Sequence, residues 1–274
     1  MNYIKIGNRR FALDGSCRIM GILNVTPDSF SDGGRFNSVE TAALRAREMV
    51  AEGADIIDVG GESTRPGHTR ISDEEEIARV VPVIERIKAE LDVPVSVDTY
   101  KSAVAGAAVK AGADLINDIW GFRYDEGLAR LTAEAGLPCV LMDNRTEPVT
   151  GDIMEAMKAT LVESIEIARR AGVADENIIL DPGIGFGKTY EQNLTAINRL
   201  DELCGLGFPV LLAASRKSVI GNTLNLPAGE RVEGTVATSV IGVMKGAAFV
   251  RVHDVKENLR AMKMTEAILK ERSV

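Results

Sequence analysis

The sequence is poor in the residues that build metal clusters and disulfide frameworks. It has two histidines and three cysteines, and the cysteines lie far apart with no CxxC pair among them. So few imidazoles and thiols exclude a site built from clustered histidine and cysteine ligands. Cys139 falls in an expected core strand and Cys204 in an expected helix. We therefore expect buried thiols in a reducing compartment, by default the cytoplasm.

Long apolar runs and an excess of positive charge are also missing. No apolar segment approaches the roughly 20 residues that span a membrane, and the N-terminal stretch MNYIKIGNRRFALDG lacks the apolar core of a secretion signal. The net charge of −8 and the isoelectric point near 5.0 argue against a nucleic-acid surface. We expect neither a membrane nor a nucleic-acid partner. An anionic ligand would need a local basic cluster, for which Arg65, Lys217 and Arg251 are available.

What the sequence does contain is a repeated pattern of short, apolar, β-branched runs that end in polar residues. Turn residues flank each run, and a segment of helical period follows it, which is typical of alternating strands and helices. Strands buried on both faces have no structural use for polar carboxyl ends, so these ends predict a shared site. The eight runs are IMGILN, DIIDVGGE, PVSVD, DLINDI, CVLMDN, IILDPG, PVLLAASRK and FVRVHD.

This alternation predicts an α/β fold, a (β/α)8 TIM barrel, with a doubly wound open sheet as the alternative. Residues 3–13 alternate around a Gly-Asn turn and predict a β-hairpin that plugs the amino-terminal end of the barrel. With 45% apolar residues, nine prolines and no linker, residues 1–274 are expected to form a single domain. Helices are expected at residues 39–52, with Ser38 as N-cap, 72–91, 101–111, 125–135, 152–171, 192–206, 230–245 and 256–271.

Two loops that follow strands are rich in special residues. NVTPDSFSDGG, residues 24–34, is either a turn-rich connector or a mobile lid with Asn24 as an oxygen ligand of phosphate-bound Mg²⁺. In DVGGESTRPG, Thr64 and Arg65 offer a hydroxyl and a bidentate fork to an anion, and two glycines allow close approach of the backbone. The simpler alternative is a salt bridge between Glu62 and Arg65, which leaves the glycines unexplained.

Two further motifs contain candidate phosphate or ring ligands. DPGIGFGKT lacks the GxxxxGK[ST] spacing of a phosphate loop. The candidate features left in this motif are Asp181 at the strand end and a turn that carries Phe186 over the site. The alternative role of Asp181 is to cap the following turn. SRKS, residues 215–218, offers hydroxyls, amides and two cations to an anion, with a solvated charge pair as the alternative.

The last strand and two inner strands complete the candidate set. Arg251 and His253 alternate onto one face at the end of the last strand, FVRVHD. A lone core histidine is usually structural, but a buried arginine two residues away is costly without an anionic partner. Asp98 and Asn117 would need donors, which a flat heterocycle with a guanidine-like edge supplies. We expect two subsites: a ring-binding collar of Asp98, Asn117, Asp181 and Lys217, and a diphosphate and metal subsite of Asn24, Arg65, Arg251 and His253.

These motifs together resemble the dihydropteroate synthase family. The likeness runs from about Arg18 to Val255 and rests on GILNVTPDSFSDGG, DVGGESTRPG, PVSVDTYK, LINDI, DPGIGFGKT, SRKSVIG and RVHDV. It implies a (β/α)8 barrel that joins p-aminobenzoate to 6-hydroxymethyl-7,8-dihydropterin diphosphate in folate synthesis. It also implies Mg²⁺ as cofactor and a homodimer, for which the apolar outer helices around residues 236–244 and 259–269 are available. Core packing is the alternative explanation of the same apolar pattern.

The resemblance also implies roles for individual residues. Counterparts of Asp98, Asn117, Asp181 and Lys217 hold the pterin. Counterparts of Thr64, Arg65, Arg251 and His253 hold the diphosphate, that of Asn24 touches Mg²⁺, and that of Asp32 helps to close the site. Those of Phe30, Pro66, Phe186 and Ser218 shape the p-aminobenzoate pocket. From these we expect Asp98, Asp181, Lys217 and Asp32 to be catalytic, in a dissociative substitution without a protein nucleophile.

Two positions depart from the family pattern. Asp143 stands where the family usually has histidine, which puts an additional negative charge at the barrel mouth and calls for a partner such as Arg145. Ala213 stands where glycine is usual, and its methyl group would crowd the floor of the pterin site. All the ligand-binding positions carried over are present, so we interpret both changes as tuning.

Three other functions compete with a synthase. A pterin-dependent methyltransferase shares the collar but has no use for a diphosphate subsite. A Schiff-base aldolase would use Lys217 as nucleophile, which requires a lowered pKa, whereas the nearby Asp181 should favour the charged form. The third alternative is a barrel that has lost turnover and only binds pterins. Its only support is the departure of Asp143 and Ala213 from the family pattern.

Overall fold

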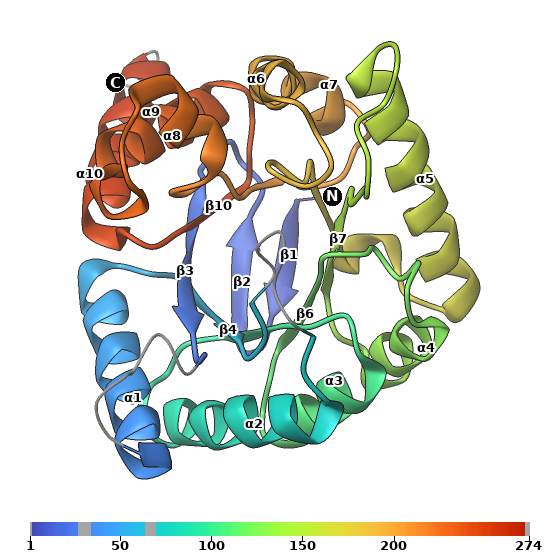
Figure 1. Ribbon diagram of the computed structural model, residues 1–274, viewed down its shortest axis with the longest axis vertical. Coiled ribbons are helices and arrows are strands. Elements are labelled where there is room, and N and C mark those ends of the chain that lie inside the picture. The colour runs from blue at the N-terminus through green and yellow to red at the C-terminus, as the bar shows by residue number, and fades with distance from the viewer. Residues whose placement is uncertain (1, 27–33, 64–69, 272–274) are drawn as a thin grey trace.

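The computed structural model describes residues 2–26, 34–63 and 70–271, the side chains of 34–38 excepted. Eight parallel strands form one sheet in the order β8-β7-β6-β5-β4-β3-β10-β9 (Figure 1). Strand order follows chain order around the sheet, as right-handed βα units in series require. The strands are β3 (Arg18–Asn24), β4 (Ile56–Gly60), β5 (Val95–Asp98), β6 (Leu115–Asp118), β7 (Cys139–Met142), β8 (Ile178–Asp181), β9 (Leu211–Leu212) and β10 (Phe249–Val252).

The two ends of this sheet meet, which makes the barrel nearly closed. Leu180 of β8 forms a parallel bridge with Val210, just before β9, and its amide donates to the carbonyl of Pro209 at 2.9 Å. On the other side, β9 pairs with β10 and β10 pairs with β3. The predicted barrel is confirmed, and the alternative of an open doubly wound sheet is wrong.

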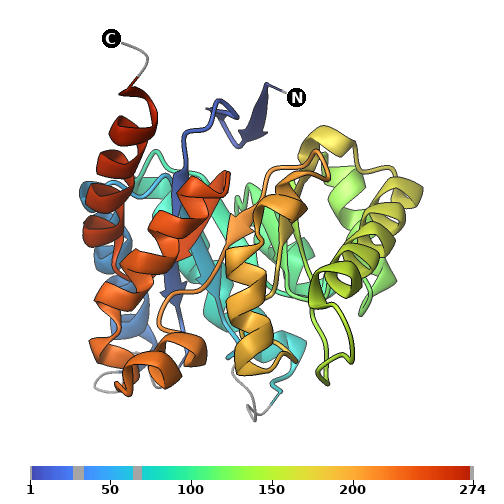
Figure 2. The ribbon, with the colours of Figure 1, turned by 90° about the horizontal axis from the view of Figure 1, so that it is seen from above.

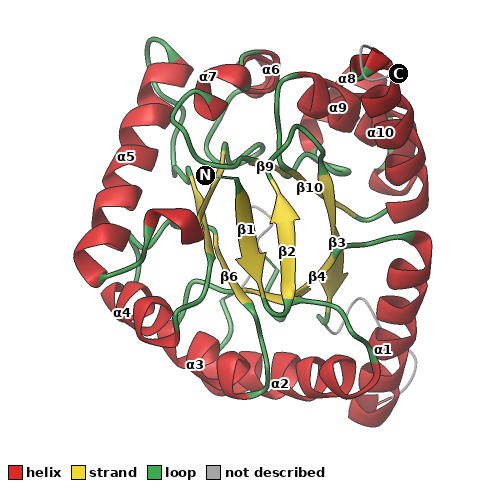
Figure 3. Ribbon diagram, turned by 180° about the vertical axis from the view of Figure 1, so that it is seen from behind, coloured by secondary structure: helices red, strands yellow, loops and turns green. Residues whose placement is uncertain are grey.

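A ring of helices surrounds the strands (Figures 1 and 3). Two expected boundaries were wrong: α1 begins at Gly34, so Ser38 lies inside it, and the backbone leaves helical geometry at Arg199, which divides the segment expected at 192–206. The helices are α1 (Gly34–Glu52), α2 (Asp73–Glu90), α3 (Ser102–Lys110), α4 (Glu126–Ala135), α5 (Ile153–Ala171), α6 (Tyr190–Asn198), α7 (Asp201–Cys204), α8 (Ser218–Leu224), α9 (Val232–Met244) and α10 (Val255–Leu269).

The N-terminal residues form the expected hairpin and seal one end of the barrel. Strands β1 (Tyr3–Ile6) and β2 (Arg9–Ala12) are antiparallel, and Figure 2 shows them at the end opposite to the arrowhead of β3. Burial of apolar surface holds the hairpin in place. Ile4, Ile6 and Phe11 pack on the innermost side chains of the strands, namely Met20, Ile56, Leu115, Val140, Ile179, Leu211 and Phe249.

A polar layer lies above this apolar layer inside the barrel. Every second residue of a strand points inward, so the next inward side chain comes two residues later on each strand. Ile56, Leu115, Ile179 and Phe249 belong to the plugged layer. The next inward positions on the same strands are Asp58, Asn117, Asp181 and Arg251, whereas the residues between them, such as Ile57, Ile116, Leu180 and Val250, pack toward the helices. The barrel interior is thus an apolar floor with a charged layer on top.

Candidate functional site

Arg251 lies at the centre of the polar layer and joins two strands. Its Nε donates to Asp58 Oδ2 at 2.6 Å, and its Nη2 donates to Asp98 Oδ2 at 2.6 Å. Asn117 Nδ2 approaches the same Asp58 carboxylate at 3.3 Å. The expectation that Arg251 needs an anionic partner inside the barrel is confirmed, and β4, β5, β6 and β10 all contribute to the cluster.

Asp58 was not predicted as a site residue, although it is the first residue of the polar strand end in the run DIIDVGGE. Its side chain is fully buried, and it pairs with Arg251 and approaches Asn117. The signal was its inward position, two residues after Ile56. Gly60 separates Asn24 from Asp98: a methyl carbon built on it would lie 3.6 Å from Asn24 Oδ1 and 3.5 Å from Asp98 Cβ. The next glycine, Gly61, instead faces α2, so its role is helix packing rather than ligand approach.

The carboxylate of Asp98 has one paired and one unpaired oxygen. Oδ2 accepts from Arg251, whereas the buried Oδ1 has no hydrogen-bond partner among the described residues. Burial raises the pKa of Asp98 to about 7, although the charge of Arg251 opposes that rise. A buried acceptor without a donor is costly, so this oxygen is suited to a donor on a bound molecule.

Asp181 and Lys217 approach the layer from the other side of the barrel. Burial raises the pKa of Asp181, while the positive charge of Lys217 lowers it. Burial lowers the pKa of Lys217 to about 8, and the charge of Asp181 opposes this. Asp181 does favour the charged form of Lys217, as expected, but desolvation outweighs the neighbouring carboxylate and the pKa of Lys217 falls.

The turn after β9 separates the two cations of SRKS. Arg216 adopts a left-handed backbone with φ of 58°, and its Nε donates to Asp254 Oδ2 at 3.0 Å outside the layer. Lys217 then points into the barrel mouth, where Nζ donates to the carbonyl of Ile184 at 2.6 Å and lies 4.8 Å from the centre of the Phe186 ring. Ser218 begins α8 and is exposed at the mouth. Lys217, rather than the pair, is therefore the ligand candidate.

His253 lies next to the same turn. Its Nδ1 is 3.0 Å from Ser215 Oγ, and its backbone amide donates to that oxygen at 3.2 Å. Arg45 of α1 donates to the His253 carbonyl at 3.1 Å. The serine thus orients the imidazole ring at the end of β10. Several expected site residues, Phe30, Asp32, Thr64, Arg65 and Pro66, lie outside the described residues.

Two other strand-end carboxylates have structural partners. Glu62 pairs with the buried Lys101 at 2.7 Å and accepts from the Tyr100 hydroxyl at 2.6 Å. Asp118 accepts from the amides of Trp120 and Phe122 at 2.8 and 2.6 Å, and burial raises its pKa to about 6. Asp118 therefore holds the turn that follows β6.

Asp143, the first departure from the family pattern, is neutralised by two cations. Arg145 Nη2 lies 2.9 Å from Asp143 Oδ1, as expected, and Lys188 Nζ lies 2.8 Å from Oδ2. The lysine was not anticipated. Ala213, the second departure, is buried directly after β9. The additional charge at the mouth is therefore compensated inside the protein.

A resident metal would have few protein ligands here. Within the described residues, no group of three or more His, Cys, Asp or Glu side chains is arranged to hold a metal ion. Asn24 at the end of β3 offers one amide oxygen beside Gly60. Mg²⁺ commonly takes only one or two protein oxygens when substrate phosphates and water supply the rest. The residues present fit an ion of that kind.

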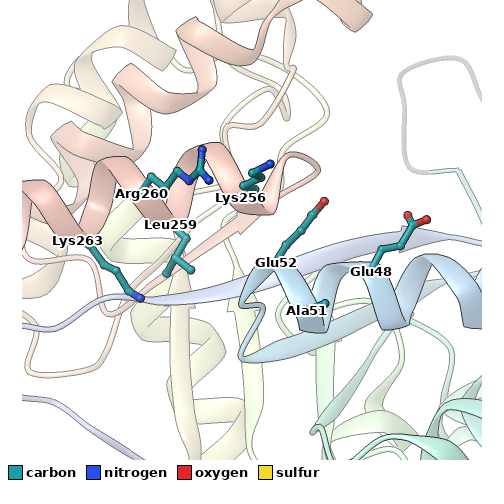
Figure 4. Close-up of a pocket in the computed structure, with 7 residues that line it drawn as sticks. All are labelled: Glu48, Ala51, Glu52, Lys256, Leu259, Arg260 and Lys263. Atoms are coloured by element: carbon teal, nitrogen blue, oxygen red, sulfur yellow. The ribbon is translucent and has the colours of Figure 1, made fainter.

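A surface cleft of about 550 Å³ lies elsewhere, between α1 and α10 (Figure 4). It is formed by outer helix surfaces and includes none of the strand-end residues. The cleft is lined by Glu48, Ala51, Glu52, Lys256, Leu259, Arg260 and Lys263.

No helix in the described part of the chain has the length and apolar character needed to cross a membrane.

Comparison with known proteins identifies close relatives over nearly the whole chain. Residues 20–253 match the model of the pterin binding enzyme family. The dihydropteroate synthase of Clostridium beijerinckii is 59% identical over 97% of this chain and 100% of that protein. That of Bacillus subtilis is 57% identical over 93% of this chain and 90% of its own length.

Solved structures give the same result. The dihydropteroate synthase of Clostridium difficile in the presence of pteroic acid is similar with a TM-score of 0.90 and 50% identity, covering 96% of this chain and 98% of that one. The Xanthomonas albilineans enzyme with 4-aminobenzoic acid is similar with a TM-score of 0.94 and 42% identity, covering 98% of both chains. The fold described above is therefore shared with a protein solved in the presence of pteroic acid and with one solved with 4-aminobenzoic acid.

Proposed function

The chain belongs to the pterin-binding enzymes, among the dihydropteroate synthases, and on that premise we propose how its polar layer condenses the two substrates. The reaction joins p-aminobenzoate to 6-hydroxymethyl-7,8-dihydropterin diphosphate and releases diphosphate, a step of folate biosynthesis. One observation supports the proposed ring site above all others: within the described part of the chain, the buried Asp98 Oδ1 has no hydrogen-bond donor. The amino and ring N–H groups of a pterin supply such donors.

In this proposal, the pterin ring lies on the collar of Asp98, Asn117, Asp181 and Lys217. The carboxylates accept from the guanidine-like edge of the ring, and the ammonium of Lys217 donates to a ring acceptor. The surrounding barrel excludes water, which strengthens each of these interactions. The plugged apolar floor below supplies a rigid base, because its side chains are close-packed.

The diphosphate lies toward Arg251 and His253. Both are strand-end residues of β10, and the hydroxyl of Ser215 orients the imidazole. The loop residues Thr64 and Arg65 complete this subsite by resemblance to the family. Arg65 suits the role because the planar fork of an arginine binds phosphate oxygens in a bidentate manner. Nε and Nη2 of Arg251 already donate to Asp58 and Asp98, so Arg251 contributes its charge and its remaining N–H groups.

Magnesium is the cofactor we propose, with Asn24 as its protein ligand. When bound, the ion supplies charge neutralisation for the leaving diphosphate. Asn24 contributes an amide oxygen from the end of β3, beside the Gly60 backbone. Asp32, from the same loop, is proposed to help close the site.

The bond between the pterin methylene and the diphosphate oxygen breaks first, so no protein nucleophile is needed. Arg251 and His253 stabilise the negative charge that develops on the leaving group, while Asp98 and Asp181 stabilise the positive charge left on the pterin. The amine of p-aminobenzoate then forms the new C–N bond and loses a proton. Phe186 and Ser218, with Phe30 and Pro66 of the loops, are proposed to form the pocket for this substrate.

The rival functions do not survive the comparisons. A methyltransferase and an aldolase both disagree with relatives that are dihydropteroate synthases over 97% and 93% of this chain. The notion of a binding-only barrel rested on Asp143 and Ala213, and Asp143 is neutralised by Arg145 and Lys188. The charge at the mouth therefore gives no reason to expect lost turnover.

The test of the proposal is diphosphate release from the dihydropterin diphosphate ester with Mg²⁺, measured with and without p-aminobenzoate. We expect release coupled to formation of dihydropteroate, and a requirement for the metal. Tight binding of the ester with no product in the presence of both substrates would contradict the proposal. Borohydride trapping with a carbonyl substrate serves as a check on Schiff-base chemistry, and no trapped adduct is expected.

We further propose a cytoplasmic homodimer. Exposed apolar side chains lie on both α9 and α10. These two helices pack side by side (Figures 1 and 2). The three cysteines are free thiols, and the expected burial holds for Cys17 and Cys139, whereas Cys204 is half-buried. Free thiols suit a reducing compartment. Light scattering should give twice the mass of 29.4 kDa, and Met264→Lys with Ile268→Lys should return the monomer mass. The exposed side chains are Ile241, Met244, Met264, Ile268 and Leu269.

A further inference from the structure

Lys188 is a fully buried cation outside the proposed substrate collar. Its side chain has 0% exposure, as has that of Asp143, which lies 2.8 Å from Nζ. Nζ also donates to the carbonyls of Asp143, Gly183 and Phe186, at 3.2, 3.0 and 3.2 Å. An ammonium inside a protein requires such a set of acceptors, so the surrounding backbone is arranged around it.

The carboxylate partner of this lysine is itself held in place. Arg145 Nε donates to Asp143 Oδ2 at 3.1 Å, and Arg145 Nη2 donates to the carbonyl of Ala156 and to Thr160 Oγ1, at 2.5 and 2.7 Å. Ala156 and Thr160 belong to α5, so the ion cluster is anchored to the outer helical layer. The cluster has little freedom to shift.

The loop of residues 182–188 is folded tightly against this cluster. A side chain at Gly183 would overlap the carbonyl oxygen of Asp143, and one at Gly187 would overlap that of Arg145. Gly183 has φ of 64° and Gly187 has φ of 52°, both in the region that favours glycine. The close contacts of Gly183 and Gly187 with neighbouring carbonyls and the buried ammonium of Lys188 therefore fix the same loop, residues 182–188.

This loop contacts the proposed catalytic residues at three points. The amide of Gly183 donates to Asp181 Oδ1 at 2.7 Å, and the carbonyl of Ile184 accepts from Lys217 Nζ at 2.6 Å. The Phe186 ring lies 4.8 Å from Lys217 Nζ. A displacement of the loop would therefore move both an acceptor of Lys217 and the aromatic wall beside it.

We propose that Lys188, neutralised by Asp143, is a positioning residue that holds the 182–188 loop so that Ile184 and Phe186 place Lys217 and form the p-aminobenzoate wall. It acts through Lys217 and Phe186 and does not itself contact substrate. This inference rests on the proposed function, because it assigns the loop to the second substrate.

The test compares Lys188→Met with the wild-type protein in steady-state kinetics. We expect the KM for p-aminobenzoate to rise by about tenfold, as misplaced binding groups do, with a smaller change in the KM for the pterin ester. The collar residues Asp98 and Asn117, on β5 and β6, keep the pterin in place. The alkaline limb of kcat/KM should also move to higher pH, because the charge of Lys188 helps to lower the pKa of Lys217.

Two further variants separate positioning from stability. Asp143→Asn with Lys188→Met removes both charges of the buried pair, while Arg145, 16% exposed, keeps its bonds to Ala156 and Thr160. The double variant should keep the rise in KM while unfolding cooperatively, as exchanges of buried pairs for neutral groups often do. It replaces the single variant if that variant does not fold. Lys158→Met removes a lysine that pairs with Glu155 and Glu202 on the surface, and it should leave both constants unchanged.

An unchanged KM for p-aminobenzoate in a folded Lys188→Met protein, with an unchanged alkaline limb, would overturn the inference. That result leaves the proposed function intact, since the wild-type protein still turns over. A wild-type protein that forms no dihydropteroate refutes the proposed function instead.

Discussion

Arg251 Nη2 donates to Asp98 Oδ2 at 2.6 Å, although 153 residues separate the two in sequence. The guanidinium also binds Asp58, so one cation holds two carboxylates inside the barrel. Removing either side leaves buried charge without a partner, which is costly. Substitutions at Asp98 must therefore preserve the shape and hydrogen bonding of its side chain.

Asp98→Asn meets this condition and should lower kcat by about 10²–10³-fold, the usual cost of removing one charge-stabilising group from an active site. The amide keeps an oxygen for Arg251 but cannot balance positive charge on the pterin. Steady-state turnover measures the effect, and circular dichroism should show an unchanged fold. Asp175→Asn, at an exposed ion pair with Arg169, is the matched control and should retain full activity. Near-normal turnover of the Asp98 variant would remove this residue from the mechanism.

The pH dependence of kcat/KM should be bell-shaped, because two groups must each be in one protonation state. This constant reports the groups of the free enzyme, here Asp98 and Lys217. Asp98 must be ionised, and its pKa is raised to about 7, so activity rises with pH through that value. Lys217 must be charged, and its pKa is lowered to about 8, so activity falls above that value. In Lys217→Arg the alkaline limb should disappear, since a guanidinium stays protonated. An alkaline limb that persists in this variant assigns it to another group.

Gly183→Ala should destabilise the protein more than Gly136→Ala. Both glycines have φ of 64°, so both substitutions carry the same backbone penalty, about 1–2 kcal/mol. A side chain at Gly136 meets nothing within 4 Å, whereas one at Gly183 overlaps the carbonyl of Asp143. We expect the overlap to add about 1–3 kcal/mol. Denaturant unfolding of the two variants gives the difference directly, and equal losses would show that the loop yields freely.

Asp143→His, which restores the usual family residue, should destabilise this protein by about 3–5 kcal/mol. Lys188 would lose its carboxylate while its side chain is fully buried. Asp201→His breaks an exposed ion pair with Lys245 and should cost less than about 1 kcal/mol. Thermal unfolding measures both variants. A stable Asp143→His protein would mean that Lys188 finds other acceptors or loses its proton.

The arrangement of the barrel and its polar layer was predictable because strand alternation is a local property. Once Ile56, Ile179 and Phe249 are assigned inward, Asp58, Asp181 and Arg251 follow two residues later. The plugging hairpin was equally evident from its own alternation. These inferences need only the period of a strand and the parallel order of the barrel.

The pairings within the layer were not predictable in the same way. Nothing local to Arg251 distinguishes Asp58 from Asp98 as its partner, and the structure uses both. Lys188 has the sequence context of a solvated loop cation, but its burial depends on Asp143, 45 residues earlier in the chain. The break at Arg199 was missed because residues 192–206 keep a helical period across it, with Leu200 and Leu203 both buried.

The hairpin that seals the barrel also constrains the order of folding during synthesis. The Phe11 ring packs edge-on against Phe249, with ring centres 6.0 Å apart, so the hairpin rests on a strand that is synthesised much later than the hairpin itself. A nascent chain that lacks β10 offers the hairpin only part of the apolar surface on which it packs in the folded protein. The apolar side chains of Ile4, Ile6 and Phe11 therefore stay exposed, or covered by other surfaces, until β10 has left the ribosome.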